Sequence, residues 1–426
     1  MKEVTKPKFT GVIAFMFKIV RFPSKVDNFF RSLKTEFRFG HFEYFRMLVL
    51  LIAASWEDRN ISSLYRFLDK DHFPHRTRYN NFMNTARWEP DKLLAKKAYE
   101  TLESLNLKKG ETIYLILDDS KKDKRGKEMD AVGWVYDPVS KKSVWGHQYV
   151  KATIYVRGIT IPFAIRLYVK DKNSLKLGIP FRKVTELAAE MIRSFIAPKG
   201  TRVLVLFDTY YLCPVVTKAC KEKKFHFISV LKSNRNLKKR GKKFKSGSYG
   251  AYCFRNKEKS KMKISKEHGI ASYKFVDAGW IEISKLGLSH LIFSRKNSER
   301  KILALVTDHP RLKAVDIIRS YDVRWNIEVF FKDAKQLLGL GRYRNRSYKA
   351  AVTHLHLVCF AYALLTHIAI NSTCEKENKK NKARVSMRDR QNILRTIIWN
   401  DTAQYLKELP NQNSVFKELS KLLIAA

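Results

Sequence analysis

Residues 321–335 read Tyr321-Asp-Val-Arg324-Trp-Asn-Ile-Glu328-Val-Phe-Phe-Lys-Asp-Ala-Lys335. This is the most informative segment of the sequence for both fold and function. At about 100° per residue, the four numbered residues fall within about 60° of one another around a helix. One carboxylate therefore shares a helix face with a phenol and two cations. This suits metal-assisted phosphodiester chemistry, in which the acid holds Mg²⁺ and the cations hold a nucleic-acid backbone. The alternative is a solvated helix face with an ion pair.

Other carboxylates stand where predicted strands end. Asp118 and Asp119 close the apolar strand Thr112 to Leu117, and Asp208 closes Arg202 to Phe207. Acids at strand ends can simply form turns or caps. Three side chains from two strand ends and a later helix can also converge on two metal ions.

The charge of the chain predicts a polyanionic partner. It has 84 Lys and Arg residues against 40 Asp and Glu residues, a formal net charge of +44 over 426 residues. Because such an excess repels itself in a compact fold, a nucleic acid is the simplest partner. Hydrophobic residues make up 45% of the chain, which excludes intrinsic disorder.

The sequence gives no sign of a membrane or secreted protein. No apolar run reaches the roughly 20 residues of a membrane span, and His354 to Ile370, which holds three histidines, is interpreted as a buried helix. We expect no signal peptide. Five cysteines without a C-x-x-C pair favour a reducing compartment over a disulfide framework or a zinc site.

The N-terminal part, residues 1–105, is predicted to be a helical DNA-binding region. Its short helical patterns Ile61 to Leu68 and Arg76 to Ala86 favour a helix-turn-helix, with Arg76, Arg78 and Arg87 facing DNA. An ordinary pair of packed helices is an equal alternative. Residues 106–230 then alternate strands with a helix, which indicates an α/β sheet.

Residues 231–309 are predicted to be a β-rich insertion with a basic loop. Lys232 to Lys245 holds eight basic residues and no acid, so we expect it not to pack and to track phosphates. Residues 310–372 are predicted to be helical again. Residues 373–426 are predicted to form a separate helical segment, which begins with a polar linker from Glu375 to Lys382. The candidate phosphate-binding residues of the loop are Lys238, Lys239, Arg240, Lys242 and Lys243.

The helix pattern resembles a known family. The spacing Y-x-x-R-x-x-x-E-x-x-x-x-x-x-K, met by Tyr321, Arg324, Glu328 and Lys335, is similar to the glutamate-helix signature of DDE transposases of the insertion-sequence-four superfamily. The resemblance spans about residues 110–370.

The same resemblance selects the other acids. In this family the first acid is followed by Thr or Ser, which fits Asp119-Ser120 better than Asp118, and the second fits Asp208-Thr209. It implies that Asp119, Asp208 and Glu328 hold two Mg²⁺ ions, for which Mn²⁺ can substitute. The residues alone leave the choice between Asp118 and Asp119 open.

The resemblance also implies a fold and an activity. The fold is an RNase H-like catalytic domain with a β-rich insertion, flanked by helical N- and C-terminal segments. Residues 106–230 would form the first part of the catalytic core, and residues 310–372, with the glutamate helix, its second part. The activity is cut-and-paste transposition: hydrolysis at transposon ends, often through a hairpin intermediate, and transfer of the freed 3′-OH into target DNA. The implied partners are double-stranded DNA, with terminal inverted repeats and a target, and a second copy of the chain. The implied location is the cytoplasm of a prokaryotic cell, with the nucleoid.

Trp280 is the only tryptophan between Asp208 and Arg324. The resembling family uses a tryptophan of its insertion to stack an extruded base during hairpin formation, and Trp280 matches it by region only. Packing in the core of the insertion is the alternative for this residue.

Two other functions compete with transposition. A nuclease or resolvase of the RNase H fold would share the acids without strand transfer. A catalytically inactive, transposase-derived DNA-binding protein would keep only the basic surfaces.

Overall fold

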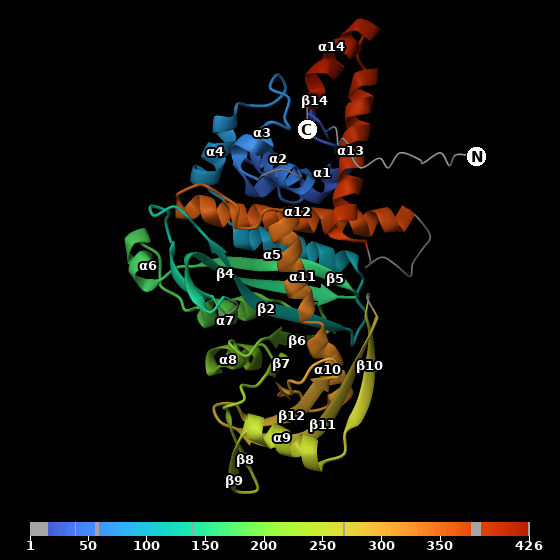
Figure 1. Cartoon of the computed structure of the whole chain (residues 1–426). Coiled ribbons are helices and arrows are strands. Elements are labelled where there is room, and N and C mark those ends of the chain that lie inside the picture. The colour runs from blue at the N-terminus through green and yellow to red at the C-terminus, as the bar shows by residue number, and fades with distance from the viewer. Residues whose placement is uncertain are drawn as a thin grey trace, which may run out of the picture.

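The computed structural model describes residues 16–38, 40–55, 59–137, 140–266, 269–375 and 385–424. A large mixed sheet with helices on both faces organises these residues (Figure 1). The mixed α/β class predicted from the sequence is therefore confirmed.

The described residues of the N-terminal region are mostly helical. Asn60 starts α3, because its side chain accepts a hydrogen bond from the Ser63 backbone N–H, and Pro90 stands at the first position of α5. The elements are β1 (Met16–Phe17), α1 (Ser24–Arg31), the 3₁₀ helix η1 (Lys34–Glu36), α2 (His41–Ala54), α3 (Ile61–Tyr65), α4 (Arg76–Thr85) and α5 (Pro90–Ser104).

The central sheet follows with three helices. Its elements are β2 (Thr112–Asp123), β3 (Gly133–Asp137), β4 (Lys142–Val156), β5 (Ile159–Tyr168), α6 (Asp171–Leu177), α7 (Val184–Ser194), β6 (Arg202–Phe207), α8 (Pro214–Glu222) and β7 (His226–Val230). Strand β4 pairs antiparallel with both β5 and β2, while β6 lies parallel to β2 and β7. The strand order is thus β5-β4-β2-β6-β7, with β3 paired to the first part of β4.

The predicted β-rich region continues the same sheet. It comprises β8 (Asn236–Lys239), β9 (Lys242–Lys245), α9 (Ser246–Asn256), β10 (Ser260–Lys266), β11 (Gly269–Ile283), β12 (Gly287–Lys296) and β13 (Leu303–Thr307). Strand β13 pairs antiparallel with β7, so the sheet passes from the central strands into the insertion without a break.

The basic segment corrects one expectation. We expected no packing there, but β8 and β9 form a hairpin, and β8 pairs with β11. Arg240 and Gly241 both have positive φ values, 46° and 77°, as a two-residue type I′ turn requires. Leu237 inside this hairpin is buried and anchors it to the sheet.

The C-terminal part is helical. Its elements are α10 (Ala314–Asp322), α11 (Trp325–Leu337), α12 (Tyr348–Glu375), α13 (Met387–Lys407), α14 (Gln412–Leu422) and β14 (Leu423–Ile424). Of the predicted linker, Glu375 ends α12 and residues 376–382 lie outside the described residues. Helix α12 runs between the N-terminal helices and the sheet (Figure 1). It is long and apolar enough to cross a membrane, but 89% of that stretch is buried inside the protein, as in a core helix.

Two hydrophobic cores lie on opposite faces of the sheet and fix which side chains can meet. Ile116 of β2 packs in the core that contains α10, α11 and α12. Leu115 and Leu117 pack in the other core, with α7 and α8.

Candidate active site

The alternation of β2 separates the two adjacent aspartates. Side chains of a strand point to opposite faces in turn, so Asp118 continues the face of Ile116 and Asp119 continues the face of Leu117. The face of Ile116 is the one that α11 covers. Asp118 therefore shares a layer with the glutamate helix.

Arg324 joins two carboxylates on that face. Its Nη1 lies 3.1 Å from Oδ2 of Asp118, and its Nη2 donates to Oε1 of Glu328 one turn along α11. Only 16% of the Arg324 side chain is exposed, which strengthens both interactions relative to a surface pair. The guanidinium also lies 5.9 Å from the ring centre of Tyr321.

The helix that carries these residues is not continuous. The sequence predicted one helix over 321–335, whereas α10 ends at Asp322 and α11 begins at Trp325. Between them the backbone bonds run three residues back, from Arg324 N–H to the Tyr321 carbonyl and from Ile327 N–H to the Arg324 carbonyl. This tighter 3₁₀ turn aligns residues three apart, so Tyr321 and Arg324 still share a face.

Asp208 follows β6, the strand that lies next to β2. Its Oδ1 accepts backbone N–H bonds from Tyr210 at 2.9 Å and Tyr211 at 3.4 Å, which hold the carboxyl in place. Parallel strands β2 and β6 bring Asp118 and Asp208 to the same edge of the sheet, where the Asp208 carboxylate raises the pKa of Asp118.

Asp119 has a different set of contacts. It accepts hydrogen bonds from the Tyr211 hydroxyl at 3.2 Å and from Nε2 of Gln148 at 2.7 Å, and Lys121 lies 3.4 Å away. The family pattern favoured Asp119 as the first acid, but the carboxylate that meets Arg324 is that of Asp118. Sequence reasoning did not single out Gln148 or Tyr211; the strand alternation that places Gln148 and Asp119 near each other depends on the register of β2 with β4.

The carboxyl groups are held in a partly buried, acidic environment. Burial raises the pKa of Asp118 to about 7; the Asp208 and Asp119 carboxylates add to the rise and Arg324 opposes it. Burial also raises the pKa of Asp208, while its backbone N–H bonds and Arg324 lower it. Clustered carboxylates with raised pKa values indicate a site that is stabilised by added positive charge.

Lys335 lies farther along α11. Its Nζ donates to the backbone carbonyl of Lys121 on β2 at 3.3 Å. Burial lowers the pKa of Lys335, and the neighbouring Lys122 and Lys121 ammonium groups lower it further. This end of the site is consequently rich in positive charge that an incoming phosphate can neutralise.

The residues predicted from the insertion lie away from this cluster. Trp280 on β11 is 41% exposed and stacks on His290, with ring centres 5.6 Å apart. It is therefore not enclosed in the core of the insertion. The hairpin β8–β9 lies at the opposite end of the insertion from α11 (Figure 1).

Most basic side chains of that hairpin face solvent. Lys238, Arg240, Lys242 and Lys243 are exposed, and Lys238 lies 3.7 Å from the Glu282 carboxylate. Lys239 is held closer, because its Nζ donates to the Ala278 carbonyl at 2.8 Å.

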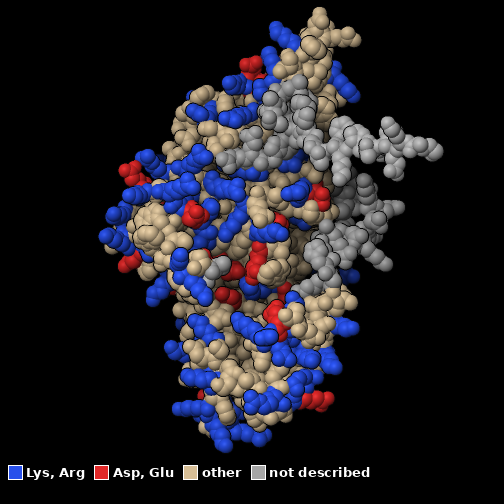
Figure 2. Space-filling model, in the orientation of Figure 1, with Lys and Arg blue, Asp and Glu red and all other residues tan. Residues whose placement is uncertain are grey.

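Acidic and basic side chains occupy different parts of the surface. Basic side chains cover much of the face seen in Figure 2, while acidic side chains gather near its middle, at the level of α11 and β2 in Figure 1. The donor set fits a hard divalent cation such as Mg²⁺, since every candidate ligand is a carboxylate oxygen.

Among the described residues, the carboxylates around Arg324 do not form a group of three whose oxygen atoms all lie within 4.8 Å of one another. Among the described residues, the group whose ligand atoms all lie within 4.8 Å of one another is a different one, Asp69, His72 and Glu418. In the carboxylate cluster the guanidinium of Arg324 supplies the positive charge between Asp118 and Glu328.

Comparisons with known proteins identify the family of the chain. A model of the transposase DDE domain matches residues 171–364, and a model of the DDE superfamily endonuclease matches residues 39–260. A probable transposase for insertion sequence element IS701 from Microchaete diplosiphon is 25% identical over 194 residues, which are 45% of this chain and 48% of that protein. The chain thus spans about half the length of this curated relative. Because the second model covers more than half of its residues, the chain belongs to the DDE superfamily of endonucleases.

Proposed function

We propose that this protein cuts DNA at the ends of an insertion sequence and joins the freed 3′-OH to target DNA, using divalent metal ions. The observation that carries the proposal is that Arg324 contacts both Asp118 and Glu328, while Asp208, at the end of the neighbouring strand β6, acts on the same guanidinium electrostatically. The family to which the chain belongs and the transposase name of its relative support this class of reaction.

The strand order supports an RNase H-like catalytic domain. The order β5-β4-β2-β6-β7 combines an antiparallel meander with two parallel additions. The acids then stand on β2, after the neighbouring β6 and on the later helix α11, which covers the face of Asp118.

We propose Asp118, Asp208 and Glu328 as the ligands of two Mg²⁺ ions, in place of the set with Asp119. Mn²⁺ shares the preference for oxygen ligands and should substitute. When bound, the ions would activate the attacking water or 3′-OH and stabilise the leaving oxygen. Asp119 then acts as a supporting residue, because its bonds to Gln148 and Tyr211 fix the end of β2.

The cations of the helix would hold the DNA backbone beside those ligands. Arg324 is a rigid planar donor and can bind a phosphate through two N–H groups, whereas Lys335 offers a point charge. In the free protein Arg324 is engaged by Asp118 and Glu328. Entry of a phosphate would therefore compete for the guanidinium and leave the two carboxylates available for cations. The Tyr321 ring beside Arg324 limits where that side chain can move.

The substrate is proposed to be double-stranded DNA carrying terminal inverted repeats, together with a target duplex. The +44 charge and the exposed hairpin of Lys238, Arg240, Lys242 and Lys243 support this partner. Two ends must be held together before they are joined, so we propose a homodimer in the DNA complex. Exposed Trp280 supports a hairpin intermediate in which an extruded base stacks on its ring.

A cleavage assay tests the proposed function. The purified full chain is mixed with labelled duplexes that contain the DNA ends flanking its own reading frame. We expect nicking that needs Mg²⁺ or Mn²⁺, stops with EDTA and disappears in Glu328→Gln while DNA affinity stays close to wild type. Full cleavage by Glu328→Gln, or equal cleavage in EDTA, would contradict the proposal.

The nuclease or resolvase alternative is separated by a second reaction. Pre-cut ends with a free 3′-OH are incubated with a supercoiled target and wild-type protein. Joined end–target products support transposition, whereas cleavage without joining supports a nuclease. An inactive DNA-binding protein would give neither product with intact affinity.

A further inference from the structure

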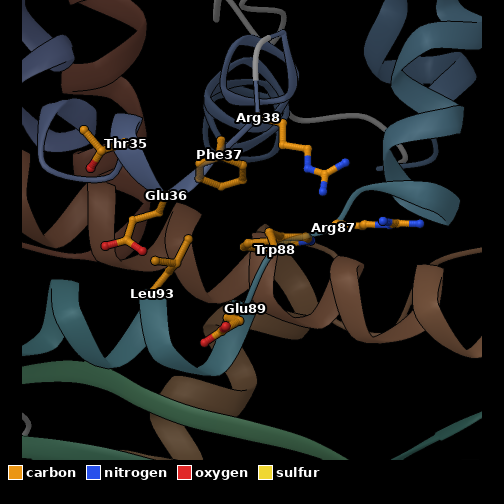
Figure 3. A pocket seen from close by; sticks show the side chains of 8 residues that line it. All are labelled: Thr35, Glu36, Phe37, Arg38, Arg87, Trp88, Glu89 and Leu93. Carbon is orange, nitrogen blue, oxygen red and sulfur yellow. The ribbon is translucent and has the colours of Figure 1, made fainter.

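A pocket in the N-terminal region lies apart from the carboxylate site. It opens between the residues that follow η1 and the start of α5, and has a volume of about 520 Å³ (Figure 3). This volume is within the usual range for small-molecule sites. Its apolar wall is formed by Phe37, Trp88 and Leu93.

The aromatic rings of this wall are fixed by their neighbours. Phe37 and Trp88 stack with ring centres 5.6 Å apart, and Phe37 also stacks on Phe45 at 4.7 Å. Trp88 packs against Phe360 of α12. Both Phe37 and Trp88 remain partly exposed, so they present ring surface that is ordered before any ligand arrives. Pre-ordering lowers the entropy cost of binding a planar group.

Positive charge gathers at one side of the pocket. Arg38 and Arg87 extend on the same side of the two rings in Figure 3, although they are far apart in sequence. Both are exposed, and within the part of the chain that the structure describes neither guanidinium has a hydrogen bond or ion pair. Two such cations on one pocket favour an anion between them.

The acidic side of the pocket is already neutralised. Glu36 lies opposite the arginines in Figure 3 and is bound by Lys96 at 3.0 Å and Lys92 at 3.6 Å. It is therefore not the partner of Arg38 or Arg87. Glu89 also lines the pocket, at the lower edge in Figure 3, and Lys92 lies 4.0 Å from its carboxylate. Both acids thus have a lysine beside them, whereas neither arginine has an acidic ion-pair partner among the described residues.

A second, smaller pocket adjoins the first. It has a volume of about 270 Å³, shares Trp88 with the first pocket, and is lined also by Tyr348 and Lys349. Each pocket thus offers an aromatic ring and a basic side chain, and the Lys349 ammonium group also donates to the Thr85 carbonyl at 3.0 Å. This repetition suits a chain of units that each carry a planar group and a negative charge.

We propose that the pocket of Arg38, Arg87, Phe37 and Trp88 binds an unpaired nucleotide of DNA. The phosphate lies between the two guanidiniums and the base stacks against the exposed ring surface. A base inside a duplex has both faces covered by its neighbours, so only an unpaired or extruded base can use this wall. The inference rests on the DNA-binding part of the proposed function and not on cleavage.

The test measures binding with cleavage removed. The full chain carrying Glu328→Gln is titrated by fluorescence anisotropy with a transposon-end duplex, and with the same duplex extended by a short single strand. We expect the extension to tighten binding at least about 5-fold, the lower end of what one stacked base contributes. Replacing the bases of the extension by abasic sites should remove most of that gain.

Matched variants test whether the increase in affinity caused by the single-stranded extension comes from the pocket. Arg38→Gln with Arg87→Gln should lose the gain from the extension. A control pair, Arg31→Gln with Arg311→Gln, removes the same charge from exposed positions outside the pocket and should keep it. Trp88→Phe, which keeps an aromatic ring in the wall and so spares the fold, should weaken the gain further than it weakens duplex binding.

Three outcomes would overturn the proposal. One is a gain that survives in the Arg38 and Arg87 pair, and another is an equal loss in the control pair. The third is that a free deoxynucleoside monophosphate binds the pocket with the same affinity as the single-stranded extension. The pocket would then be a site for a free nucleotide and not for DNA. If duplex binding persists while the gain fails, the proposed function stands and only this inference falls.

Discussion

Asp118 and Asp119 are neighbours in the chain, yet they serve opposite layers of the protein. Asp118 meets Arg324 under α11, and Asp119 meets Tyr211 and Gln148 on the other face of β2. A shift of one residue along a strand moves a carboxylate across the sheet. The first acid of the proposed site is therefore a matter of strand alternation and not of local sequence.

Exchanging these two aspartates for asparagine should separate their roles. Asp118→Asn should abolish detectable cleavage of end DNA, because it removes a proposed metal ligand. Asp119→Asn should reduce cleavage by about 10- to 100-fold, the range for groups that orient ligands. Steady-state nicking rates measure both, and DNA affinity is the control. Equal, complete loss in both variants, or normal cleavage by Asp118→Asn, would contradict the assignment.

Trp280 allows a second test on a single residue. If its ring receives an extruded base, Trp280→Ala should leave the first nick intact and stop hairpin formation. An abasic site at the extruded position should partly restore the hairpin, because the strain of removing the base is then gone. Products are resolved on denaturing gels. Trp399, which is also 41% exposed but lies on α13, provides the control variant. Parallel loss of both steps with a lower Tm would show a structural role instead.

The signature residues were predictable because a helix carries them at fixed spacing. Tyr321, Arg324 and Glu328 meet in the structure although a 3₁₀ turn interrupts the helix between them. That turn left no mark in the spacing, since three- and four-residue steps both return to one face. The choice between Asp118 and Asp119 depended on which face α11 covers, a tertiary fact that the strand sequence does not contain.

At the scale of elements, the hairpin β8–β9 shows how a very basic segment can be ordered. Its charges point outward while Leu237 is buried and the backbone pairs with β11. The sequence predicted the charge correctly and the packing wrongly. In the sequence, only one leucine and an Arg-Gly pair indicate an ordered hairpin, whereas eight basic residues indicate a solvated loop.

Neutralising two lysines of the hairpin should weaken DNA binding without regard to DNA sequence. Lys242→Gln with Lys243→Gln should flatten the dependence of log K on log salt by up to about 0.9 for each phosphate that the protein no longer neutralises. Lys172→Gln with Lys176→Gln, exposed on α6, removes equal charge and is the control. A salt slope that changes equally in both pairs, or in neither, would argue against phosphate binding by the hairpin.

Helix α12 carries a built-in sensitivity to acid. Burial lowers the pKa of His354 to about 4, and its Nε2 lies 3.0 Å from the Gly339 carbonyl. An unfolded histidine titrates near 6.5, so between about pH 6.5 and 4 the unfolded chain binds more protons than the folded protein. Stability should therefore fall as pH drops through that window, by on the order of 2 kcal/mol at pH 5 from this residue.

Urea unfolding at pH 7.5 and pH 5 measures this effect. His354→Gln keeps a donor for the Gly339 carbonyl and should lose less stability than wild type on acidification. His75→Gln, an exposed position, should behave as wild type. A variant of His354 that is as acid-sensitive as wild type would show that other groups, such as His147, dominate the loss.

At the scale of the whole molecule, charge sets the conditions under which the fold is most stable. A formal charge of +44 is spread over a protein with two well-formed cores. The cores explain why the chain folds at all against its own repulsion. The sequence predicted both the charge and the mixed architecture, because each is a sum over many residues.

Salt should therefore act in opposite directions on stability and on DNA binding. Raising NaCl from low to moderate concentration should raise the Tm of the free protein, since screening weakens the repulsion among like charges. The same change should lower DNA affinity steeply. Thermal unfolding and anisotropy on one salt series measure both. A Tm that falls or stays constant while affinity drops would mean that the charges are already balanced within the fold.

The path of the sheet was beyond the reach of sequence patterns. The strands of the insertion were predicted, but their attachment was not, because pairing between β7 and β13 joins residues far apart in the chain. Local alternation indicates that a strand exists and does not name its neighbour.

Because of that attachment, the insertion is a rigid extension of the central sheet. Val306 of β13 is paired with Ser229 of β7, and the Ser229 hydroxyl donates to the backbone carbonyl of Asp208. A load applied at β11, where Trp280 stands, is carried through rows of backbone hydrogen bonds rather than through a flexible joint. We therefore expect the insertion and the strand end that bears Asp208 to move as one rigid unit, so that a force on β11 also displaces the Asp208 carboxylate.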